Sequence, residues 1–283
     1  FGYSEFSLRL PSVLSSFICL SICFFITSLI SSNKTALISI VSLSSMPLWV
    51  QYSRYSSPDI PFVFCILLVI LFFLKSLDSS EYQRQYFYIT MSGLFVSISF
   101  FIRSYMAFVP IIGLSPFVFY HLIRKDNIFK VLFCSGIFLG SIPTFLNLYF
   151  SFQKFGIIGI TSLFDFAKNK VLGEVGFNNL IFLPLNFIYL TFPIGIITLV
   201  LFIFTRSNIY IKYPLLFFGY PLLSLILLLF MSTSYPHYFL FLLPSLSMIF
   251  STYLTSNSFR YSFSKSTIRY LLFILLLSIT FIL

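Results

Sequence analysis

The chain has 283 residues, of which 59% are hydrophobic and 8% are charged, and its mean hydropathy is +1.02. Soluble domains carry about 25% charged residues, so this sequence cannot cover a water-facing surface. The composition therefore predicts an all-α, polytopic transmembrane helical bundle, because helices satisfy their backbone hydrogen bonds inside hydrocarbon. The net charge of +10 does not point to a nucleic-acid partner. The basic residues lie in short loops between apolar runs, where a positive-inside bias and contact with membrane lipids account for them.

About ten apolar runs are candidate membrane spans. In chain order they are 12–30, 35–50, 60–74, 86–102, 104–122, 130–150, 181–204, 213–231, 238–255 and 268–283. The runs at 35–50 and 60–74 are shorter than the roughly 20 residues that a straight span needs. We expect these two to borrow flanking residues or to end in a polar cavity.

The Lys and Arg residues predict an orientation. If the first span runs from outside to inside, the loops of one side hold eleven of the 17 Lys and Arg residues and the other loops hold six. The richer side is predicted to be cytoplasmic. The opposite, outer side then gathers a mixed set of charged and titratable residues: Glu5, Arg9, Arg54, Asp59, Arg103, Asp165, Glu174 and His237.

One connector is long. Residues 151–180 have an amphipathic middle, which predicts an outer-face loop or interfacial helix. No other feature divides the chain, so we expect a single integral membrane domain over 1–283.

Motifs of soluble enzymes and metal-ligand spacings are absent from the sequence. The four cysteines lie inside apolar runs, and Cys19 and Cys23 are most simply explained as buried thiols. No cofactor or metal site is predicted, and dependence on a divalent metal is left open.

The stretch "YSRYSSPDIPF" (52–62) holds Arg54 and Asp59 between two apolar runs. An ionisable group near membrane depth usually faces a protein interior or a water-filled cavity, which makes Asp59 a candidate site residue. The structural alternative is that "SSPD" supplies the capping chemistry of a helix start. Arg54 has a similar alternative, as an anchor to lipid headgroups.

Arg103, in "SISFFIRSYMAFVPIIG", stands between two apolar runs with almost no loop around it. A charge there needs a partner or solvent, and a phosphate suits the planar guanidinium because two parallel hydrogen bonds can form. The alternative is a side chain that snorkels to the outer interface. In "STSYPHYFLFLLPS", His237 and Tyr238 start a span on the outer side, where they are either site residues or ordinary interfacial aromatics.

Four segments resemble a known family. "FGYSEFSLRLPS" is similar to the stretch that opens the second membrane helix of lipid-linked sugar transferases of the GT-C class. That branch includes protein O-mannosyltransferases and aminoarabinose transferases. "YSRYSSPDIPFVF" resembles the family's Y-x-R-x-x-x-PD pattern, and "FFIRSYMAFVP" occupies the place of an outer turn that commonly reads TKG or TR. "SYPHYFLFLLPSLSMI" is similar to the late R/H-Y-x-L-x-x-LP motif, so the matches run in order from about residue 2 to residue 250.

The resemblance implies a GT-C-like fold and transfer of a sugar from a polyprenyl-phosphate-linked donor to a lipid, glycan or protein acceptor. It implies a bacterial inner (plasma) membrane enzyme whose active site faces the periplasm or exterior. The family's catalytic base lies in a first outer loop that would precede Phe1, so we expect an N-terminally incomplete chain that lacks this acid. Asp59 is then a supporting carboxylate, and Arg54, Arg103, His237 and Tyr238 are expected to bind substrate or donor phosphate. Glu5 and Arg9 are secondary candidates.

Two other functions stay open. A transporter or flippase for lipid-linked glycans would spread charges along a pathway at the membrane midplane. A polysaccharide polymerase or ligase would also use a polyprenyl carrier, but it favours a large outer loop with several arginines, and residues 151–180 contain none. The crowding of charges at outer span ends favours the transferase.

Overall fold

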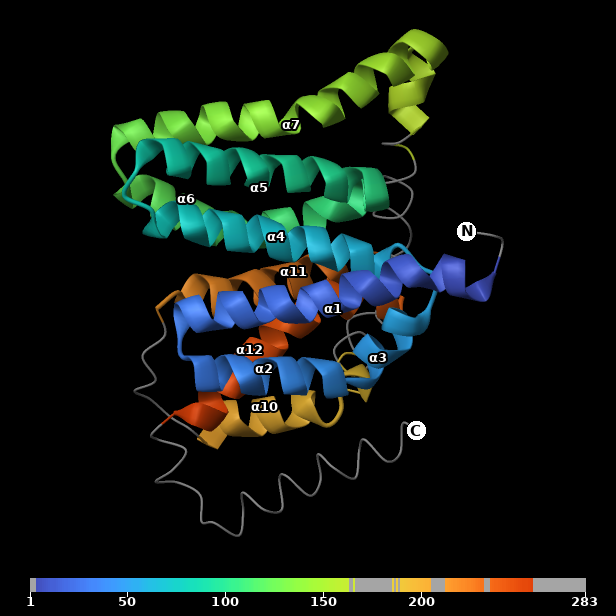
Figure 1. Cartoon of the computed structure of the whole chain (residues 1–283). Coiled ribbons are helices and arrows are strands. Elements are labelled where there is room, and N and C mark those ends of the chain that lie inside the picture. The colour runs from blue at the N-terminus through green and yellow to red at the C-terminus, as the bar shows by residue number, and fades with distance from the viewer. Residues whose placement is uncertain are drawn as a thin grey trace. The chain divides into compact units, whose positions relative to one another are not determined.

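A computed structural model describes residues 4–162, 165, 185, 187, 189–204, 212–231 and 235–256. Every regular element in these residues is helical, which confirms the predicted all-α class (Figure 1). The elements are α1 (Glu5–Ile30), α2 (Asn33–Ser45), α3 (Pro47–Arg54), α4 (Asp59–Asp78), α5 (Tyr82–Arg103), η1 (Ser104–Ala107), α6 (Phe108–Arg124), α7 (Asn127–Phe155), α10 (Ile194–Phe204), η2 (Leu215–Gly219), α11 (Tyr220–Leu229), η3 (Pro236–Leu242) and α12 (Leu243–Thr255).

Five helical segments of the described part are long and apolar enough to cross a membrane. They are Glu5–Ile30, Asp59–Asp78, Tyr82–Arg124, Asn127–Phe155 and Pro236–Thr255, and the shorter apolar helix Leu215–Leu229 accompanies them. The protein is thus an integral membrane protein, while the count of ten spans stays a prediction. The expected span 268–283 and the first part of 181–204 lie outside the described residues.

The run expected as one span at 35–50 forms two helices. α2 ends at Ser45, Met46 has extended backbone, and α3 starts at Pro47. Proline has no N–H to continue a helix and disfavours helical backbone at the preceding residue, but it suits a first helical position. Pro47 therefore starts α3, which positions the segment that leads to Asp59.

The chain divides into two compact units. The first comprises residues 1–60, 180–217 and 235–283, and the second comprises residues 61–179 and 218–234. α4 starts at the boundary, since its first two residues belong to the first unit.

In the first unit, α1, α2 and α12 pack through a seam of small polar side chains. Cys23 Sγ lies 3.3 Å from Ser39 Oγ, which lies 3.1 Å from Ser247 Oγ. Thr35 Oγ1 and Thr255 Oγ1, at 3.0 Å, add a second link between α2 and α12. Small residues let membrane helices approach closely, and interhelical hydrogen bonds of this kind contribute about 0.6 kcal/mol each. The buried thiol expected at Cys23 is confirmed, with an exposed fraction of 0%.

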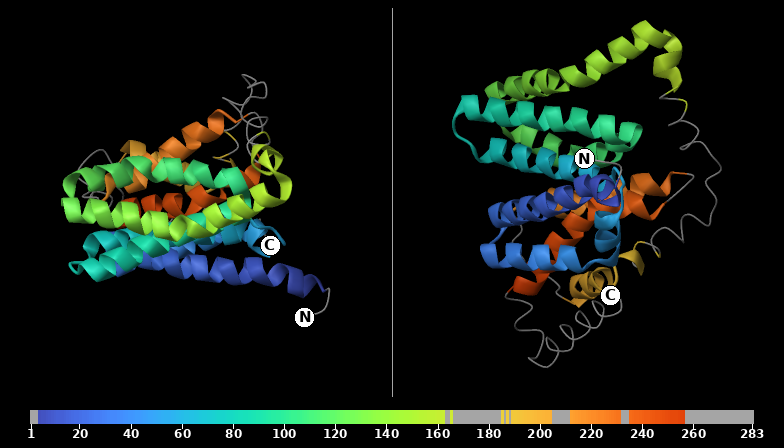
Figure 2. Two further views of the ribbon diagram at one scale, coloured as in Figure 1. Left: turned by 90° about the horizontal axis from the view of Figure 1, so that it is seen from above. Right: turned by 45° about the vertical axis from the view of Figure 1, so that its right-hand side comes forward.

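In the second unit, α5 and α7 lie side by side in all views (Figures 1 and 2). Their contact is made by glycines: Gly93 on α5 faces Ile137 and Gly140 on α7, and Gly136 faces Ile89 and Thr90 of α5. Gly136 and Gly140 are spaced as in a GxxxG motif. Ser97 Oγ donates to the Gly140 carbonyl at 3.0 Å, which ties the helices at their closest approach.

Beyond Gly140, α7 does not keep this close contact. Pro143 lies inside α7, where it removes a backbone hydrogen bond and bends the helix. Figure 1 shows α7 bending along its length. Space therefore opens between the second half of α7 and the end of α5, and that space holds the cavities described below.

Candidate functional site

Arg103 is the last residue of α5, and the chain turns sharply just after it. Ser104 has φ +48° and ψ −131°, a conformation that favours glycine because a Cβ crowds the backbone there. In the TKG form of the outer turn that this segment resembles, glycine would stand where this chain has Ser104. Such strain is concentrated at functional sites, where surrounding structure fixes it.

Replacing Ser104 with glycine should relieve this strain. We expect Ser104→Gly to raise the free energy of unfolding by about 1 kcal/mol, measured by thermal unfolding in lipid nanodiscs. Ser99→Gly on the same helix is the matched control and should destabilise, because Ser99 has ordinary helical surroundings and glycine weakens a helix interior. A loss of stability in Ser104→Gly would contradict the strain.

Three cavities with shared lining residues lie near the turn. The first, of about 280 Å³, is lined by residues of α5, η1, α6 and α7, and almost all of its wall is apolar. The second, of about 690 Å³, shares Phe100 and Ser104 with the first. The third, of about 440 Å³, shares Asn147 with the second and Leu148 with the first. The three cavities are called here the α5–α7 groove. Ser104 lines two of them and directly follows Arg103 in the chain, while Arg103 itself is not among the lining residues.

A polar stripe on α7 runs along this groove. Ser141 and Thr144 line the first cavity, Asn147 lines the second and third, and Ser151 lines the third. Their spacing of three to four residues keeps them on one face of the helix. The groove thus pairs apolar walls with hydroxyl and amide groups.

Asp59 and Arg54 belong to the first unit. α3 ends at Arg54, whose side chain is exposed, and α4 begins at Asp59, which is 5% exposed. In the first turn of α4 the carboxylate has the favourable end of the helix dipole, as the capping alternative predicts. Burial of a carboxylate is costly without compensating partners, so the capping role does not exclude a site role.

His237 and Tyr238, at the start of η3, reach the α3 segment that leads to Arg54. The centroid of the His237 ring lies 6.0 Å from that of Tyr52 and 4.6 Å from that of Tyr238. Residues separated by more than 180 positions in the chain are therefore neighbours, and two of the motifs that resemble the family meet in one unit.

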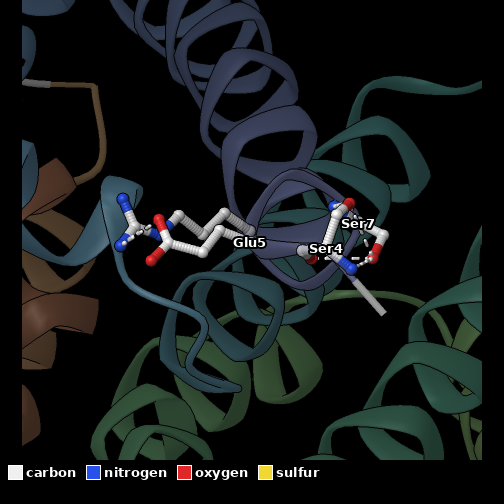
Figure 3. Close-up of polar contacts among 4 residues, drawn as sticks. Ser4, Glu5 and Ser7 are labelled. Atoms are coloured by element: carbon white, nitrogen blue, oxygen red, sulfur yellow. Dashed lines mark hydrogen bonds and ion pairs between the residues drawn. The ribbon is translucent and has the colours of Figure 1, made fainter. Parts of the chain in front are cut away.

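The secondary candidates Glu5 and Arg9 pair with each other. Arg9 Nη2 lies 3.2 Å from Glu5 Oε2 across one turn of α1, and both side chains are more than half exposed. Ser4 and Ser7 cap the same helix start, since Ser7 N donates to Ser4 Oγ and Ser4 N donates to Ser7 Oγ (Figure 3). This arrangement explains the "SE…R" motif as the N-terminal cap of α1, which begins at Glu5, earlier than the expected span start at residue 12.

The connector expected at 151–180 is described in part. α7 continues to Phe155, Gly156 turns the chain with φ +62°, and residues 157–162 are helical again. Asp165 is exposed, and Glu174 lies outside the described residues. The connector's role as a loop or interfacial helix stays a prediction.

Among the residues that the structure describes, no three His, Cys, Asp or Glu side chains come together as metal ligands. The groove, its polar stripe, and Tyr52, Tyr55 and Tyr235 near His237 were not predicted as site residues, whereas Tyr238 was. "STSYPHY" and "YSRYSS" do show repeated tyrosines, but only the tertiary structure brings them together.

Comparison with known proteins decides the family. The sequence model of the family described as dolichyl-phosphate-mannose-protein mannosyltransferase matches residues 1–150, more than half of the chain. The chain belongs to this family. This match confirms the resemblance that the sequence motifs indicate.

Solved structures agree with this family in fold. The crystal structure of ArnT from Cupriavidus metallidurans bound to undecaprenyl phosphate matches with a TM-score of 0.71 at 15% identity, covering 90% of this chain and 47% of ArnT. The apo form of the same protein matches with a TM-score of 0.68 at 15% identity, covering 89% of this chain and 46% of that one. At this identity the match shows the fold alone, and that fold is GT-C-like.

One relative of this chain is an uncharacterised protein of Aquifex aeolicus (strain VF5). It is 27% identical over 265 residues, which cover 93% of this chain and 58% of the relative. The chain therefore spans about half the length of the proteins it matches.

Proposed function

We propose that the protein transfers a sugar from a polyprenyl-phosphate-linked donor to an acceptor at the outer face of a bacterial inner membrane. The observation that carries the proposal is the Arg103–Ser104 turn beside the α5–α7 groove. Family membership and the GT-C-like fold support the same reaction class.

The groove has the chemistry that a polyprenyl phosphate needs. Phe100, Phe108 and Phe145 supply apolar wall for an isoprenoid chain. Arg103 offers a guanidinium, which binds a phosphate through two parallel hydrogen bonds that lysine cannot reproduce. When the sugar leaves, the lipid phosphate gains negative charge, and a fixed cation lowers the energy of that transition state.

The acceptor side of the reaction is assigned to the first unit. A hydroxyl or amine acceptor needs a carboxylate to position it and to help remove its proton. Asp59 is a buried carboxylate in a segment that also holds Arg54, which fits a supporting role in orienting the acceptor. His237 and Tyr238 are proposed to contribute to the same acceptor region.

The test is sugar transfer by the full-length protein in nanodiscs with a radiolabelled polyprenyl-phosphate-mannose donor and bacterial envelope acceptors. Asp59→Asn keeps the side-chain volume and removes the charge, so we expect kcat to fall about tenfold or more while donor binding is unchanged. Asp78→Asn, at the exposed opposite end of α4, is the matched control and should behave as wild type.

The outcomes separate the candidate functions. Wild-type activity in Asp59→Asn would remove Asp59 from the site. Movement of intact donor across the bilayer without cleavage would support a transporter instead. Chain-length growth of a lipid-linked polymer would support a polymerase.

A further inference from the structure

Five aromatic rings from two distant segments form one cluster in the first unit. They are Tyr52 and Tyr55 of the α3 segment, and Tyr235, His237 and Tyr238 at the start of η3, and we call them the aromatic platform. Neither α3 nor η3 could supply these rings alone.

The rings are in continuous contact. Tyr55 meets Tyr52 at 5.5 Å between centroids, and Tyr52 meets His237 at 6.0 Å. His237 is stacked on Tyr235 at 5.5 Å with an interplanar angle of 5°. Tyr238 closes the cluster with its plane nearly perpendicular to both His237 and Tyr235. These separations are those of favourable aromatic pairs, so the rings hold one another in position.

The platform keeps apolar ring surface open although its base is buried. Tyr238 is 4% exposed, whereas Tyr55 and Tyr235 are each 49% exposed. Neighbouring side chains hold both exposed rings in position. Tyr235 stacks on His237. Tyr55 contacts Tyr52, and its hydroxyl accepts a hydrogen bond from Gln51 Nε2 at 3.2 Å. A rigid, half-exposed aromatic surface costs little entropy when a ligand covers it.

One exposed polar residue borders this surface, and a buried carboxylate follows it in the chain. Arg54, adjacent to Tyr55, is exposed, and Asp59 follows Tyr55 after a tight turn in which Ser57 N donates to the Tyr55 carbonyl at 2.9 Å. Consecutive Cα atoms are about 3.8 Å apart, so the backbones of Tyr55 and Asp59 lie within about 15 Å. Ring faces, a guanidinium and a carboxylate therefore occur in one short segment.

We propose that the aromatic platform binds a saccharide, so that the acceptor of the proposed transfer reaction is a glycan. A pyranose ring presents one face of C–H groups, which are weakly positive and pack on the negative face of an aromatic ring. Its hydroxyls at the ring edge need donors and acceptors, which Arg54 and the tyrosine hydroxyls supply. Apart from proline, the residues of a peptide acceptor present no such C–H ring face. An acyl chain has no hydroxyls to pair with the bordering polar groups. The role of the saccharide as acceptor rests on the proposed function. Saccharide binding itself does not, because it can be measured without transfer.

The experiment is saturation-transfer NMR on the full-length protein in nanodiscs, free of glycoside detergents, which would compete for the platform. The probes are mannotriose, maltotriose and chitotriose. We expect at least one to receive saturation at its ring C–H protons and to bind about tenfold more weakly to Tyr55→Ala and to Tyr235→Ala. Tyr55→Phe and Tyr235→Phe keep the ring face and should stay within about threefold of wild type.

Tyr82→Ala is the matched control, because Tyr82 is 52% exposed at the start of α5 and is not part of the platform. It should bind the trisaccharides as wild type does. Failure of all three probes to bind wild type, or equal binding by the alanine variants, would overturn the proposal and leave the tyrosines as interfacial aromatics. Binding of sugar-free polyprenyl phosphate is measured on the same samples: its absence would refute the proposed function, whereas its presence without saccharide binding would refute only the platform.

Discussion

Replacing Arg103 with alanine should weaken binding of polyprenyl phosphate about 100-fold. The two charge-assisted hydrogen bonds that a guanidinium gives to a phosphate are worth roughly 1.5–3 kcal/mol, and about 2.8 kcal/mol corresponds to this factor. Arg103→Lys keeps the charge but loses the fork, so an intermediate loss of about tenfold is expected. The measurement is titration of the protein in nanodiscs with undecaprenyl phosphate, followed by native mass spectrometry.

Two controls make this result specific. Arg84→Ala removes an arginine from the opposite end of the same helix, where Arg84 pairs with Glu81 at 3.0 Å on an exposed surface. It should leave affinity unchanged. Uncharged polyprenol should bind wild type and Arg103→Ala equally well, because it offers no phosphate. Equal affinity of Arg103→Ala and wild type for the phosphate would assign Arg103 to the interface as a snorkelling side chain.

Replacing Gly140 with alanine should lower the free energy of unfolding by about 3 kcal/mol. An added Cβ would lie 2.6 Å from Leu94 N and 2.7 Å from Gly93 C, and these backbone atoms cannot rotate away as a side chain could. α5 and α7 must then separate, which breaks their close packing and the hydrogen bond from Ser97 to the Gly140 carbonyl. Thermal unfolding in nanodiscs, followed by circular dichroism, measures the loss.

Gly136→Ala supplies the comparison on the same helix face. There the closest atom to an added Cβ is Ile89 Cγ2, at 2.9 Å, which belongs to a side chain that can shift. We expect a loss of about 1 kcal/mol or less. Equal stability of Gly140→Ala and wild type would mean that the glycine contact does not hold the helices together. Because the α5–α7 groove starts where this contact ends, Gly140→Ala should also weaken polyprenyl phosphate binding.

The site shows where inference from the sequence stops. Arg103 can be predicted as a site residue from the sequence, because a lone charge between two apolar runs is costly and because its motif indicates the family. The strained backbone at Ser104 is invisible in the sequence, since serine is an ordinary turn residue and only φ and ψ reveal the departure from glycine. His237 and Tyr238 are identifiable from their motif, but the ring contacts that join them to Tyr52 come from packing between distant segments.

Composition and short motifs determine the class of this protein. A chain with so few charged residues cannot cover a water-facing surface, so its apolar segments lie in hydrocarbon. These segments are long continuous apolar runs, which suit helices that satisfy their own backbone hydrogen bonds, so the all-α membrane fold follows from the sequence alone. The order of four motifs is enough to indicate the family. Tertiary structure decides the rest, because the α5–α7 groove depends on a glycine contact followed by a bend at Pro143, and the aromatic platform depends on two segments more than 180 residues apart meeting. The GxxxG spacing of Gly136 and Gly140 and the position of Pro143 can be read from the sequence, but which helix packs against these glycines, and which distant segment meets α3, is set by the tertiary packing.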